Sequence, residues 1–364
     1  AAHLADGYFR ACGRPLAVFT SIGPGATNLA IGAATAYVDS TAMVLFTGET
    51  HSYSYGRGIF QEIERQVWAD FFSMMRPIVK RTWNIGRVDQ LPRALPDAFR
   101  WALTGRPGPV HMTLPMDVQA DAVETEIPDP ARSRPFGRIR ADPERILEAA
   151  KLVVKSQRPV MVVGGGVILA DASEELVNLA EYIGSPVITT FMGKGAIPED
   201  HPLAAYYGGA KGSDVGNKIT READVVVAVG CRFSDQSTSS YKPGVTYSIP
   251  PTKLIQIDID PAEIGKNYPV EVGIVSDAKS ALVDLLEAVR KLAKKKEYQN
   301  STYFKGLAKA KEDWLERVKV LQKIVGEKMT LSLFLKGLRE LLDRKTVLVG
   351  SAGHSQAQLF QEFP

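Results

Sequence analysis

Short apolar runs alternate with amphipathic segments along most of the chain. Such alternation is typical of parallel β-sheets whose strands are joined by crossover helices. The predicted strands are 16–20, 43–47, 109–114, 160–163, 187–189, 225–229, 254–259 and 347–349, and the predicted helices include 27–37, 144–155 and 331–342. The pattern therefore predicts an α/β fold class with tandem doubly wound parallel-sheet domains.

The pattern is interrupted where the chain becomes rich in proline and arginine. Residues 127–135 carry too few apolar side chains to pack and predict an interdomain linker. Residues 291–326 are rich in Lys and Glu and predict a solvated connecting helix. The predicted organisation is a first domain at 1–118, a linker at 119–140, a central domain at 141–298, and a connecting helix with the start of a third domain at 299–364.

Both ends of the sequence interrupt an element. Residues 1–8 have the pattern of the middle of an amphipathic helix, without a residue that would cap its start. Residues 360–364 stop without a closing element. We therefore expect the chain to be a fragment, truncated at both ends.

Composition narrows the classes of function. The chain has 364 residues, 45% of them hydrophobic and 23% charged, which is typical of a globular protein of two or three domains. Its 44 basic and 41 acidic residues are spread along the sequence, so no basic field favours a nucleic-acid partner. No apolar run is long enough to span a membrane. Cys12 and Cys231 lack the spacing of a disulfide framework or a zinc site, and a reducing, cytoplasmic location fits best.

Two loops of the first domain carry candidate chemistry. Residues 21–28, Ser-Ile-Gly-Pro-Gly-Ala-Thr-Asn, join a predicted strand to a predicted helix, where backbone N–H groups converge and glycine lets a ligand approach. The same kind of turn also occurs where glycine serves geometry alone. Gln61 follows in a glycine-bounded loop and Lys80 lies further along the chain. Loops often carry function, although a lone Gln or Lys is more often a surface residue.

The central domain presents a pattern typical of nucleotide binding. Three glycines at 164–166 directly follow a predicted buried strand, but they lack the complete G-x-G-x-x-G spacing. Arg232 and Asp258 lie at the ends of two further strands, so a cation for phosphate and a carboxylate for a hydroxyl share one sheet edge. This pair suits an adenine dinucleotide, although many such domains keep the fold and bind nothing.

The histidines favour neither a metal site nor hydrolase chemistry. None of the five has metal-ligand spacing or lies in a nucleophile motif, so no metal ligand is predicted within the chain. His111, in an apolar strand, is interpreted as a packed core residue. His354, in a glycine-bracketed turn, is placed to meet a ligand.

Together these segments resemble the thiamine-diphosphate-dependent enzymes of the acetolactate synthase (acetohydroxyacid synthase) large-subunit type, over essentially the whole chain. The motifs that carry the resemblance occur in the family's order: ADGYFR at 5–10, GPGATN at 23–28, FQE at 60–62, GRPGPV at 105–110, GGG at 164–166, MGKG at 192–195, PEDHP at 198–202 and DIDPAEIG at 258–265. The resemblance implies an aminopyrimidine-binding domain, a central domain of the FAD/DHS-like type, and the start of a diphosphate-binding domain.

The resemblance also implies an activity. Enzymes of this family use thiamine diphosphate to decarboxylate a 2-oxo acid and pass the C2 unit to a second carbonyl, a transferase reaction of branched-chain amino acid biosynthesis. The family's activating glutamate would fall just before Ala1, and its diphosphate and Mg²⁺ motif beyond Pro364. The fragment alone is therefore expected to be inactive. A homodimer or homotetramer with active sites shared between subunits is expected for the whole enzyme.

The family's functional residues carry over by motif. Gln61 and Lys80 are expected to face the substrate. The expected thiamine diphosphate contacts are Gly23, Pro24, Gly25 and Asn28, together with Gly353, His354, Ser355 and Gln356 of the diphosphate-binding domain. For FAD, an optional cofactor, the matching positions are Gly164, Gly165, Gly166, Thr190, Met192, Gly193, Arg232, Asp258, Glu263 and Asp277.

Departures from the family pattern leave the substrate open. Glu49 stands where the family has glutamine, Gly-Ala-Lys-Gly at 209–212 where it has Gly-Met-His-Gly, and Gln236 where it has a second arginine. An exposed carboxylate at Glu49 and the imidazole of His51 would change the charge that a 2-oxo acid meets. The other two changes would weaken FAD binding. The alternatives are another carboligase or C–C lyase, of the glyoxylate or sulfoacetaldehyde type, and an inactive chain that keeps only the fold.

Overall fold

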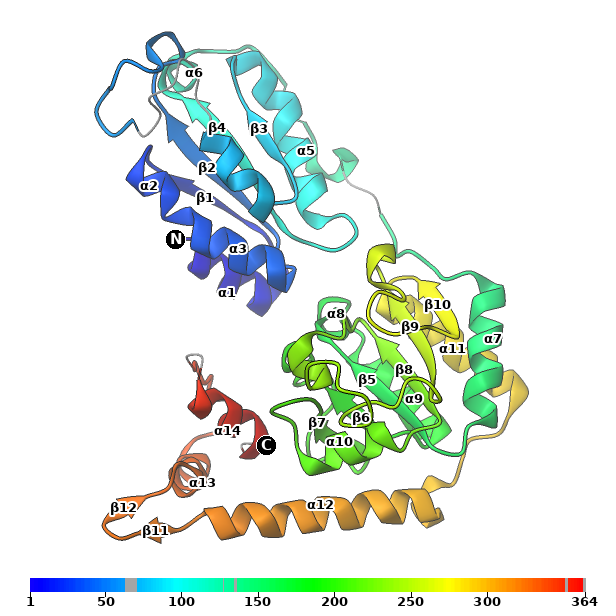
Figure 1. Ribbon diagram of the computed structural model, residues 1–364. Helices are drawn as coiled ribbons and strands as arrows, with labels where there is room; N and C mark the ends of the chain where they lie inside the picture. Colours follow the sequence, from blue (N-terminus) through cyan, green and yellow to red (C-terminus); the bar gives the residue numbers. More distant parts are fainter. Residues whose placement is uncertain (63–70, 127, 134–135, 351–352, 363–364) are drawn as a thin grey trace. The chain divides into compact units, whose positions relative to one another are not determined.

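The structure is a computed structural model that describes residues 1–62, 71–126, 128–133, 136–350 and 353–362 (Figure 1). The chain divides into two compact units, Ala1–Gly137 and Arg138–Pro364. Each unit contains a parallel sheet flanked by helices, so the predicted α/β class is confirmed. None of the described helices combines the length and the apolarity that a membrane crossing requires.

The first unit is a four-stranded parallel sheet in the order β1-β2-β4-β3. Its elements are α1 (Ala2–Cys12), β1 (Leu16–Thr20), α2 (Pro24–Thr27), α3 (Leu29–Asp39), β2 (Met43–Glu49), α4 (Phe71–Met75), β3 (Thr82–Asn84), α5 (Leu91–Leu103), β4 (Pro109–Pro115) and α6 (Met116–Ala120). Helices cover both faces of the sheet, because Met43 and Leu45 of β2 pack with α1 and α3 whereas Val44 and Phe46 pack with α5. All strands run in one direction, so their carboxyl ends share one edge.

The second unit contains a six-stranded parallel sheet in the order β10-β9-β8-β5-β6-β7. Its elements are α7 (Pro143–Lys155), β5 (Pro159–Val163), α8 (Gly165–Leu169), α9 (Ser173–Ile183), β6 (Val187–Thr189), β7 (Ala204–Tyr207), α10 (Asp214–Arg221), β8 (Val225–Val229), β9 (Lys253–Asp258), β10 (Val272–Val275) and α11 (Ala278–Leu292). The strand order reverses between β5 and β8, which makes this point the topological switch of a doubly wound sheet. The predicted doubly wound pattern is confirmed here.

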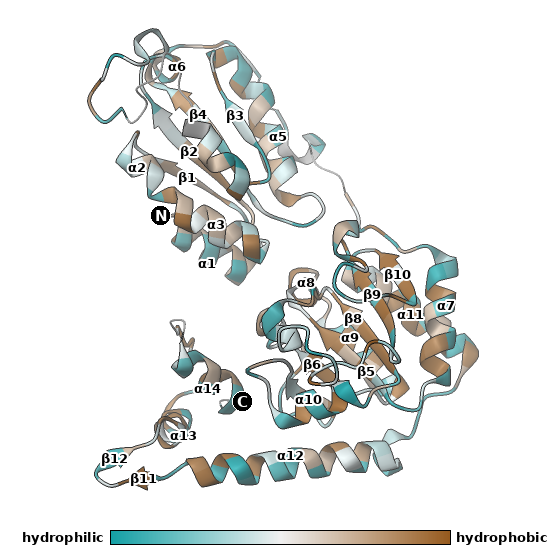
Figure 2. Cartoon of the chain, in the orientation of Figure 1, coloured by the Kyte–Doolittle hydropathy of each residue, from teal (hydrophilic) through white to brown (hydrophobic). Residues whose placement is uncertain are grey.

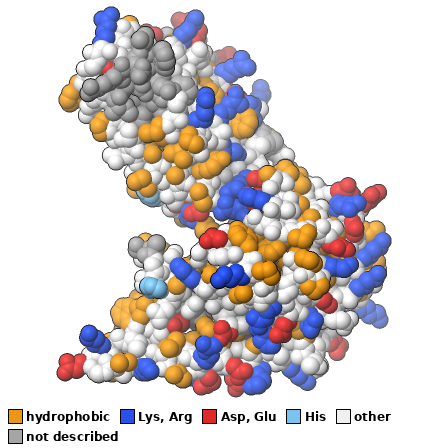
Figure 3. Space-filling model, viewed as in Figure 1, with side chains coloured by type: hydrophobic (Ala, Val, Ile, Leu, Met, Phe, Trp, Pro, Cys, Tyr) orange, Lys and Arg blue, Asp and Glu red, His pale blue; other side chains and the backbone are white. Residues whose placement is uncertain are grey.

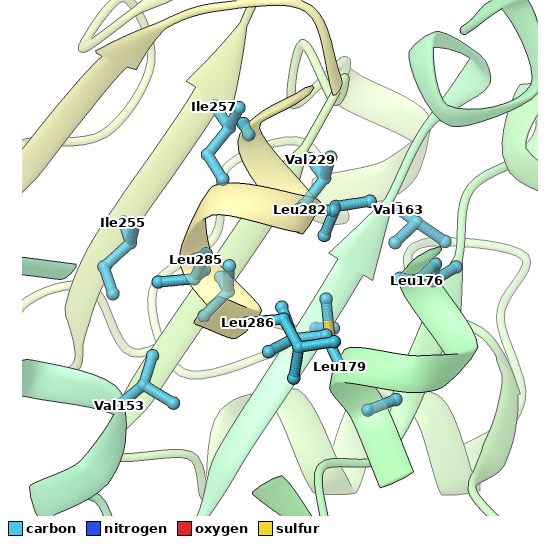
Figure 4. Close-up of a cluster of buried hydrophobic side chains, with 14 of the residues drawn as sticks. Val153, Val163, Leu176, Leu179, Val229, Ile255, Ile257, Leu282, Leu285 and Leu286 are labelled. Atoms are coloured by element: carbon cyan, nitrogen blue, oxygen red, sulfur yellow. The ribbon is translucent and has the colours of Figure 1, made fainter. Parts of the chain in front are cut away.

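Hydrophobic side chains between the sheet and its helices form the main core of this unit (Figure 4). Figure 2 shows hydrophobic residues along β8 and β9, as expected for strands buried on both faces. In α11, Leu282, Leu285, Leu286 and Val289 recur at the helical period and are buried. Asp277 caps this helix, since its carboxylate accepts a hydrogen bond from Ser280 N at 3.1 Å.

The remaining elements of this unit follow the sheet. They are α12 (Thr302–Leu321), the hairpin strands β11 (Ile324–Val325) and β12 (Lys328–Met329), α13 (Leu331–Leu341) and α14 (His354–Glu362). The strand predicted at 347–349 is wrong: Val347 and Val349 are 84% and 96% exposed, and this run pairs with no strand among the described residues. An apolar run without a partner strand forms no sheet. On the face shown in Figure 3, Lys and Arg side chains are interspersed with Asp and Glu.

Candidate functional site

The carboxyl edge of the first sheet brings the Gly23 turn and Gln61 together. Gly23 follows β1 with a φ of +55°, a conformation that favours glycine. A Cβ atom at Gly23 would lie 1.9 Å from the carbonyl oxygen of Gln61, so the two backbones are in contact and leave no room for a side chain. Gln61 itself has a φ of +66°. Two segments that the sequence predicts separately as site residues therefore meet in the fold.

Glu62, the neighbour of Gln61, fixes the loop that carries it. Its carboxylate accepts hydrogen bonds from Gly56 N, Gly58 N and Ile59 N at 2.8, 2.8 and 2.9 Å. Bonds from backbone donors to an ionised carboxylate are charge-assisted and stronger than neutral ones. The sequence pattern does not reveal this role, because a glutamate in a loop is usually solvated. The two nearby glycines are the signal that points to a tight turn.

A second carboxylate holds the other half of the same loop. Asp117, in the first turn of α6, accepts hydrogen bonds from Ser52 N at 3.0 Å and from Ser52 Oγ. Desolvation raises the pKa of Asp117, but the bonds from Ser52 outweigh it and the pKa lies below its usual range. The carboxylate is therefore ionised at neutral pH and keeps the loop attached to the end of β4.

Glu49 lies at the end of β2, beneath this loop. The residue is only 6% exposed, and Thr50 N donates a hydrogen bond to its Oε1 at 3.0 Å. The expectation of an exposed carboxylate is wrong, because β2 is a central strand whose last residue is covered. Burial, together with the charges of Glu49, Asp117 and Glu62, raises the pKa of Tyr55 to about 12. The Tyr55 phenol therefore keeps its proton at neutral pH.

Two buried hydroxyl groups at this edge have no hydrogen-bond partner among the described residues. They are Thr20 Oγ1, at the end of β1, and Thr50 Oγ1, just after β2. Leaving a buried hydroxyl without a partner costs about 1–3 kcal/mol. Both hydroxyls are enclosed by protein, whereas the amide of Asn28 beside the Gly23 turn is exposed and can meet the polar edge of a cofactor.

Lys80 lies at the opposite edge of the first sheet. Its Nζ donates hydrogen bonds to the carbonyl oxygens of Thr104 and Arg106, at 2.8 and 2.7 Å, in the turn that leads into β4. Thr104 is the C-cap of α5, so the ammonium stabilises the carboxyl end of that helix. The structure thus places Gln61 beside Gly23 but Lys80 at the amino end of β4. The substrate-facing role of Lys80 stays a prediction.

In the central unit, the glycines at the switch point pack against one another. A Cβ atom at Gly164 would lie 2.1 Å from Gly230 O, and one at Gly166 would lie 2.7 Å from Gly230 Cα. Gly193 approaches Val163 O in the same way, at 2.3 Å. These glycines are required by backbone contact, whatever binds beside them. The predicted flavin positions gathered at this turn are Gly164, Gly165, Gly166, Thr190, Met192 and Gly193.

The predicted polar flavin positions follow the next strands of the same sheet. Arg232 follows β8, and Asp258 is the buried last residue of β9, where its Oδ1 accepts a hydrogen bond from Asp260 N at 3.0 Å. Glu263 is buried in the turn after β9 and forms an ion pair with Lys266 at 3.3 Å. The structure therefore brings these positions to the carboxyl edge of the sheet, as predicted from the strand order.

Asp277, after β10, and Tyr207, at the end of β7, lie at the two outer strands of the same sheet. The Asp277 carboxylate is engaged within the protein, because besides capping α11 it accepts a hydrogen bond from Arg138 Nη1 at 2.9 Å. Tyr207 Oη, buried at the end of β7, has no partner among the described residues. Burial raises the pKa of Tyr207 above its usual value, so the phenol keeps its proton at neutral pH and can donate a hydrogen bond. The sequence does not single out this tyrosine.

The predicted diphosphate contacts lie in the second unit. Gly353 precedes α14 with a φ of +141°, and His354, Ser355 and Gln356 form its first turn. Their role toward a diphosphate stays a prediction. Within the ranges that the structure describes, no three His, Cys, Asp or Glu side chains converge as metal ligands would.

Several curated proteins similar to the chain are named acetolactate synthases. The chain is 41% identical to a probable acetolactate synthase large subunit of Methanocaldococcus jannaschii, over 98% of the chain and 59% of that protein. It is 40% identical to the acetolactate synthase large subunit of Corynebacterium glutamicum, over 84% of the chain and 48% of that protein. For the large subunit of Haemophilus influenzae, the identity is 35% over 79% and 49%. The chain spans about half to three fifths of these relatives.

One family profile covers β1 and β2 of the first sheet, and a second covers all strands of the six-stranded sheet. The profile described as "Thiamine pyrophosphate enzyme, N-terminal TPP binding domain" matches residues 1–68, and "Thiamine pyrophosphate enzyme, central domain" matches 146–285. The chain belongs to the thiamine pyrophosphate enzymes. The predicted resemblance to the acetolactate synthase large subunit is thereby confirmed.

Within this thiamine pyrophosphate enzyme, the profile for the TPP-binding domain covers the first of the two edges. Residues 1–68 include the Gly23 turn, Glu49 and the loop that carries Gln61. Glu62 and Asp117 are additions that the sequence pattern does not supply, because their roles depend on bonds formed only in the fold. The carboxylates of Glu62 and Asp117 therefore hold the loop beside the Gly23 turn in place at this edge.

Proposed function

We propose that the chain is part of an acetolactate-synthase-like transferase, which uses thiamine diphosphate to decarboxylate a 2-oxo acid and transfers the C2 unit to a second carbonyl. The contact between Gly23 and Gln61 carries this proposal, because it joins both predicted motifs inside the segment similar to a TPP-binding domain. The similarity to proteins named acetolactate synthase large subunits supports the choice of reaction.

The residues at the first edge fit the proposed cofactor. The hydroxyls of Thr20 and Thr50 lack partners among the described residues, and the amide of Asn28 is exposed. The carbonyl group of Gln61 fills the space that a side chain at Gly23 would need, so the glycine lets the Gln61 loop approach the turn. When bound, thiamine diphosphate supplies the electron sink that makes the loss of carbon dioxide from a 2-oxo acid feasible.

Gln61 is the substrate-facing residue of this proposal. Its amide can donate a hydrogen bond to a carboxylate oxygen and accept one from a hydroxyl. The loop that carries it is fastened by Glu62 on one side and by Asp117 on the other. The backbone that carries the amide is therefore held before the substrate arrives, which lowers the entropic cost of reaching the reactive geometry.

Other parts of the proposal concern further cofactors and partners. Mg²⁺ would bind with the diphosphate, which Gly353, His354, Ser355 and Gln356 would approach in a homo-oligomer with shared active sites. FAD would lie at the switch point of the central unit, between the ends of β5 and β8. A cytoplasmic location suits the two free thiols, Cys12 and Cys231.

Another carboligase or C–C lyase remains the second candidate, and one observation favours it. The family's glutamine is replaced by Glu49, whose carboxylate lies buried at the cofactor edge with Tyr55 and Asp117 nearby. An ionised carboxylate there would disfavour an anionic acceptor and favour a neutral aldehyde. The two candidates therefore differ in the second carbonyl compound rather than in the cofactor.

The test uses the complete gene product. We expect calorimetry to detect binding of thiamine diphosphate in the presence of Mg²⁺, and product analysis with pyruvate to yield acetolactate. A panel of 2-oxo acids and aldehydes as second substrates separates the two candidates. No cofactor binding by a folded, complete protein would exclude both of them.

A further inference from the structure

We propose that Glu62 is a positioning residue, which acts by holding Gln61 against the Gly23 turn. The inference rests on the proposed function insofar as Gln61 faces the substrate. It adds a residue whose effect on the reaction passes entirely through the backbone of its own loop.

The carboxylate of Glu62 accepts hydrogen bonds from three backbone amides of that loop. Oε1 accepts a hydrogen bond from Gly56 N at 2.8 Å, and Oε2 accepts from Gly58 N and Ile59 N at 2.8 and 2.9 Å. Glu62 N in turn donates to Ile59 O at 2.9 Å. Both carboxylate oxygens are therefore used, and a closed ring of bonds surrounds the segment just before Gln61.

This loop needs such a clamp because its two glycines leave the backbone many alternative conformations. Gly56, Gly58 and Gln61 have φ angles of +75°, +73° and +66°. Glycine has no intrinsic preference for this region over others, and a glutamine disfavours it. The three donors of the clamp are thus what selects one conformation from many. Once selected, that conformation places the carbonyl of Gln61 in contact with Gly23.

The clamp and the cofactor edge use different atoms, and this separates their expected effects. Glu62 bonds to its loop, whereas the group proposed to meet the cofactor is the exposed amide of Asn28. Loss of the clamp should therefore lower the population of loops with Gln61 in place and leave the affinity for thiamine diphosphate nearly unchanged. A catalytic contact between Glu62 and the cofactor would instead change both.

The chain offers a matched control in the central unit. Asp224 also holds a loop through its carboxylate, which accepts hydrogen bonds from Gln157 N and Arg158 N at 2.8 and 3.0 Å, and from Ser156 Oγ. It precedes β8 and therefore lies at the amino edge of the central sheet, away from its carboxyl edge. Asp224→Asn removes the same kind of clamp without touching a proposed site.

The kinetic experiment compares Glu62→Gln, Glu62→Ala, Gln61→Ala, the double variant Gln61→Ala/Glu62→Ala and Asp224→Asn in the complete protein. We expect Glu62→Ala to lower kcat/KM for the 2-oxo acid about tenfold to a hundredfold, with a smaller loss for Glu62→Gln. Both residues are proposed to act through the side-chain amide of Gln61. The kcat/KM of the double variant should therefore be at most about twofold lower than that of Gln61→Ala. Full multiplication of the two losses would overturn the proposal.

Two further readouts do not depend on turnover. Hydrogen exchange of the amides at 56–59 should be at least about tenfold faster in Glu62→Ala and unchanged in Asp224→Asn. Unchanged exchange in Glu62→Ala would also overturn the proposal. Calorimetry with thiamine diphosphate and Mg²⁺ should give dissociation constants within about twofold of each other for the wild type and Glu62→Ala. If the wild type bound no cofactor, the proposed function would fail, while the exchange result would still decide whether Glu62 holds the loop.

Discussion

The carboxyl edges of the two sheets both carry a glycine turn after a strand, yet the glycines serve different purposes. At the switch point of the central unit, Gly164 and Gly166 are pressed against Gly230, so protein backbone occupies the space that a side chain would need. At the edge of the first unit, Gly23 lies against the backbone of Gln61, which belongs to a loop held by carboxylates. The glycines of the central unit are needed for the packing of the fold. Gly23 is needed to place Gln61 at the proposed site.

The difference shows why a glycine-rich motif alone is ambiguous evidence for a ligand. Buried polar atoms distinguish the cases better, since Thr20 and Thr50 keep unpartnered hydroxyls at the first edge among the described residues. Among the residues that the structure describes, the unpartnered atom at the central edge is Tyr207 Oη, on β7 rather than at the glycine turn. The two edges should therefore respond differently to the same substitution.

The largest effect is expected for Gly164→Ala. The new Cβ would lie 2.1 Å from Gly230 O, between two strand ends that cannot both move. Overpacking of this severity should lower the free energy of unfolding by about 3 kcal/mol. Urea unfolding followed by circular dichroism measures it. Gly306→Ala is the control, because nothing lies within 4 Å of that site inside α12. The control should gain stability by up to about 1 kcal/mol.

Gly23→Ala should affect activity more than stability. The Cβ would meet Gln61 O at 1.9 Å, but that oxygen belongs to a surface loop, which can move away. We expect kcat/KM to fall about a hundredfold as Gln61 is displaced, while the free energy of unfolding falls by about 1–2 kcal/mol. If Gly23→Ala lost as much stability as Gly164→Ala and retained kcat/KM, Gly23 would be a packing glycine like Gly164 rather than a glycine of the site.

Much of the fold follows from the sequence, whereas the site follows only in outline. Runs such as 225–229 and 160–163 predict buried parallel strands because Val-rich segments of this length suit little else. The run at 347–349 looks the same in sequence, yet it forms no strand, since pairing depends on a partner that the pattern of one segment does not reveal. The same limit applies to Glu62 and Asp117, whose bonding partners are backbone amides that the fold must first bring near.

Acid should lower the stability of the first unit by about 2 kcal/mol more than that of the central unit. His111 is fully buried in β4 with its Nε2 2.9 Å from Thr47 Oγ1, and burial lowers its pKa to about 4. The unfolded chain binds this proton near the ordinary pKa of about 6.5. Stability is therefore present above that pH and is lost as the pH falls toward 4. Between pH 7 and pH 5 the expected loss is about 2 kcal/mol.

Hydrogen exchange at both pH values can locate this loss. Corrected for the intrinsic effect of pH, peptides of the first unit should lose protection at pH 5 more than peptides of the central unit. His111→Gln should flatten the pH response of the first unit, although the variant starts from a lower stability. An equal loss in both units would assign the acid response to other groups.

The smallest effect is expected for Lys80, where the family resemblance and the geometry point to different roles. A substrate-facing lysine should raise KM when it is lost, whereas a lysine that caps α5 should lower stability alone. Its bonds to Thr104 and Arg106, at the amino end of β4, favour the second role. We therefore expect Lys80→Met to lower the free energy of unfolding by about 1 kcal/mol with KM unchanged. Lys80→Arg, which keeps the charge, should retain part of that stability. An increase in KM for the 2-oxo acid at unchanged stability would show that Lys80 reaches a substrate after all, and that both edges of the first sheet serve the reaction.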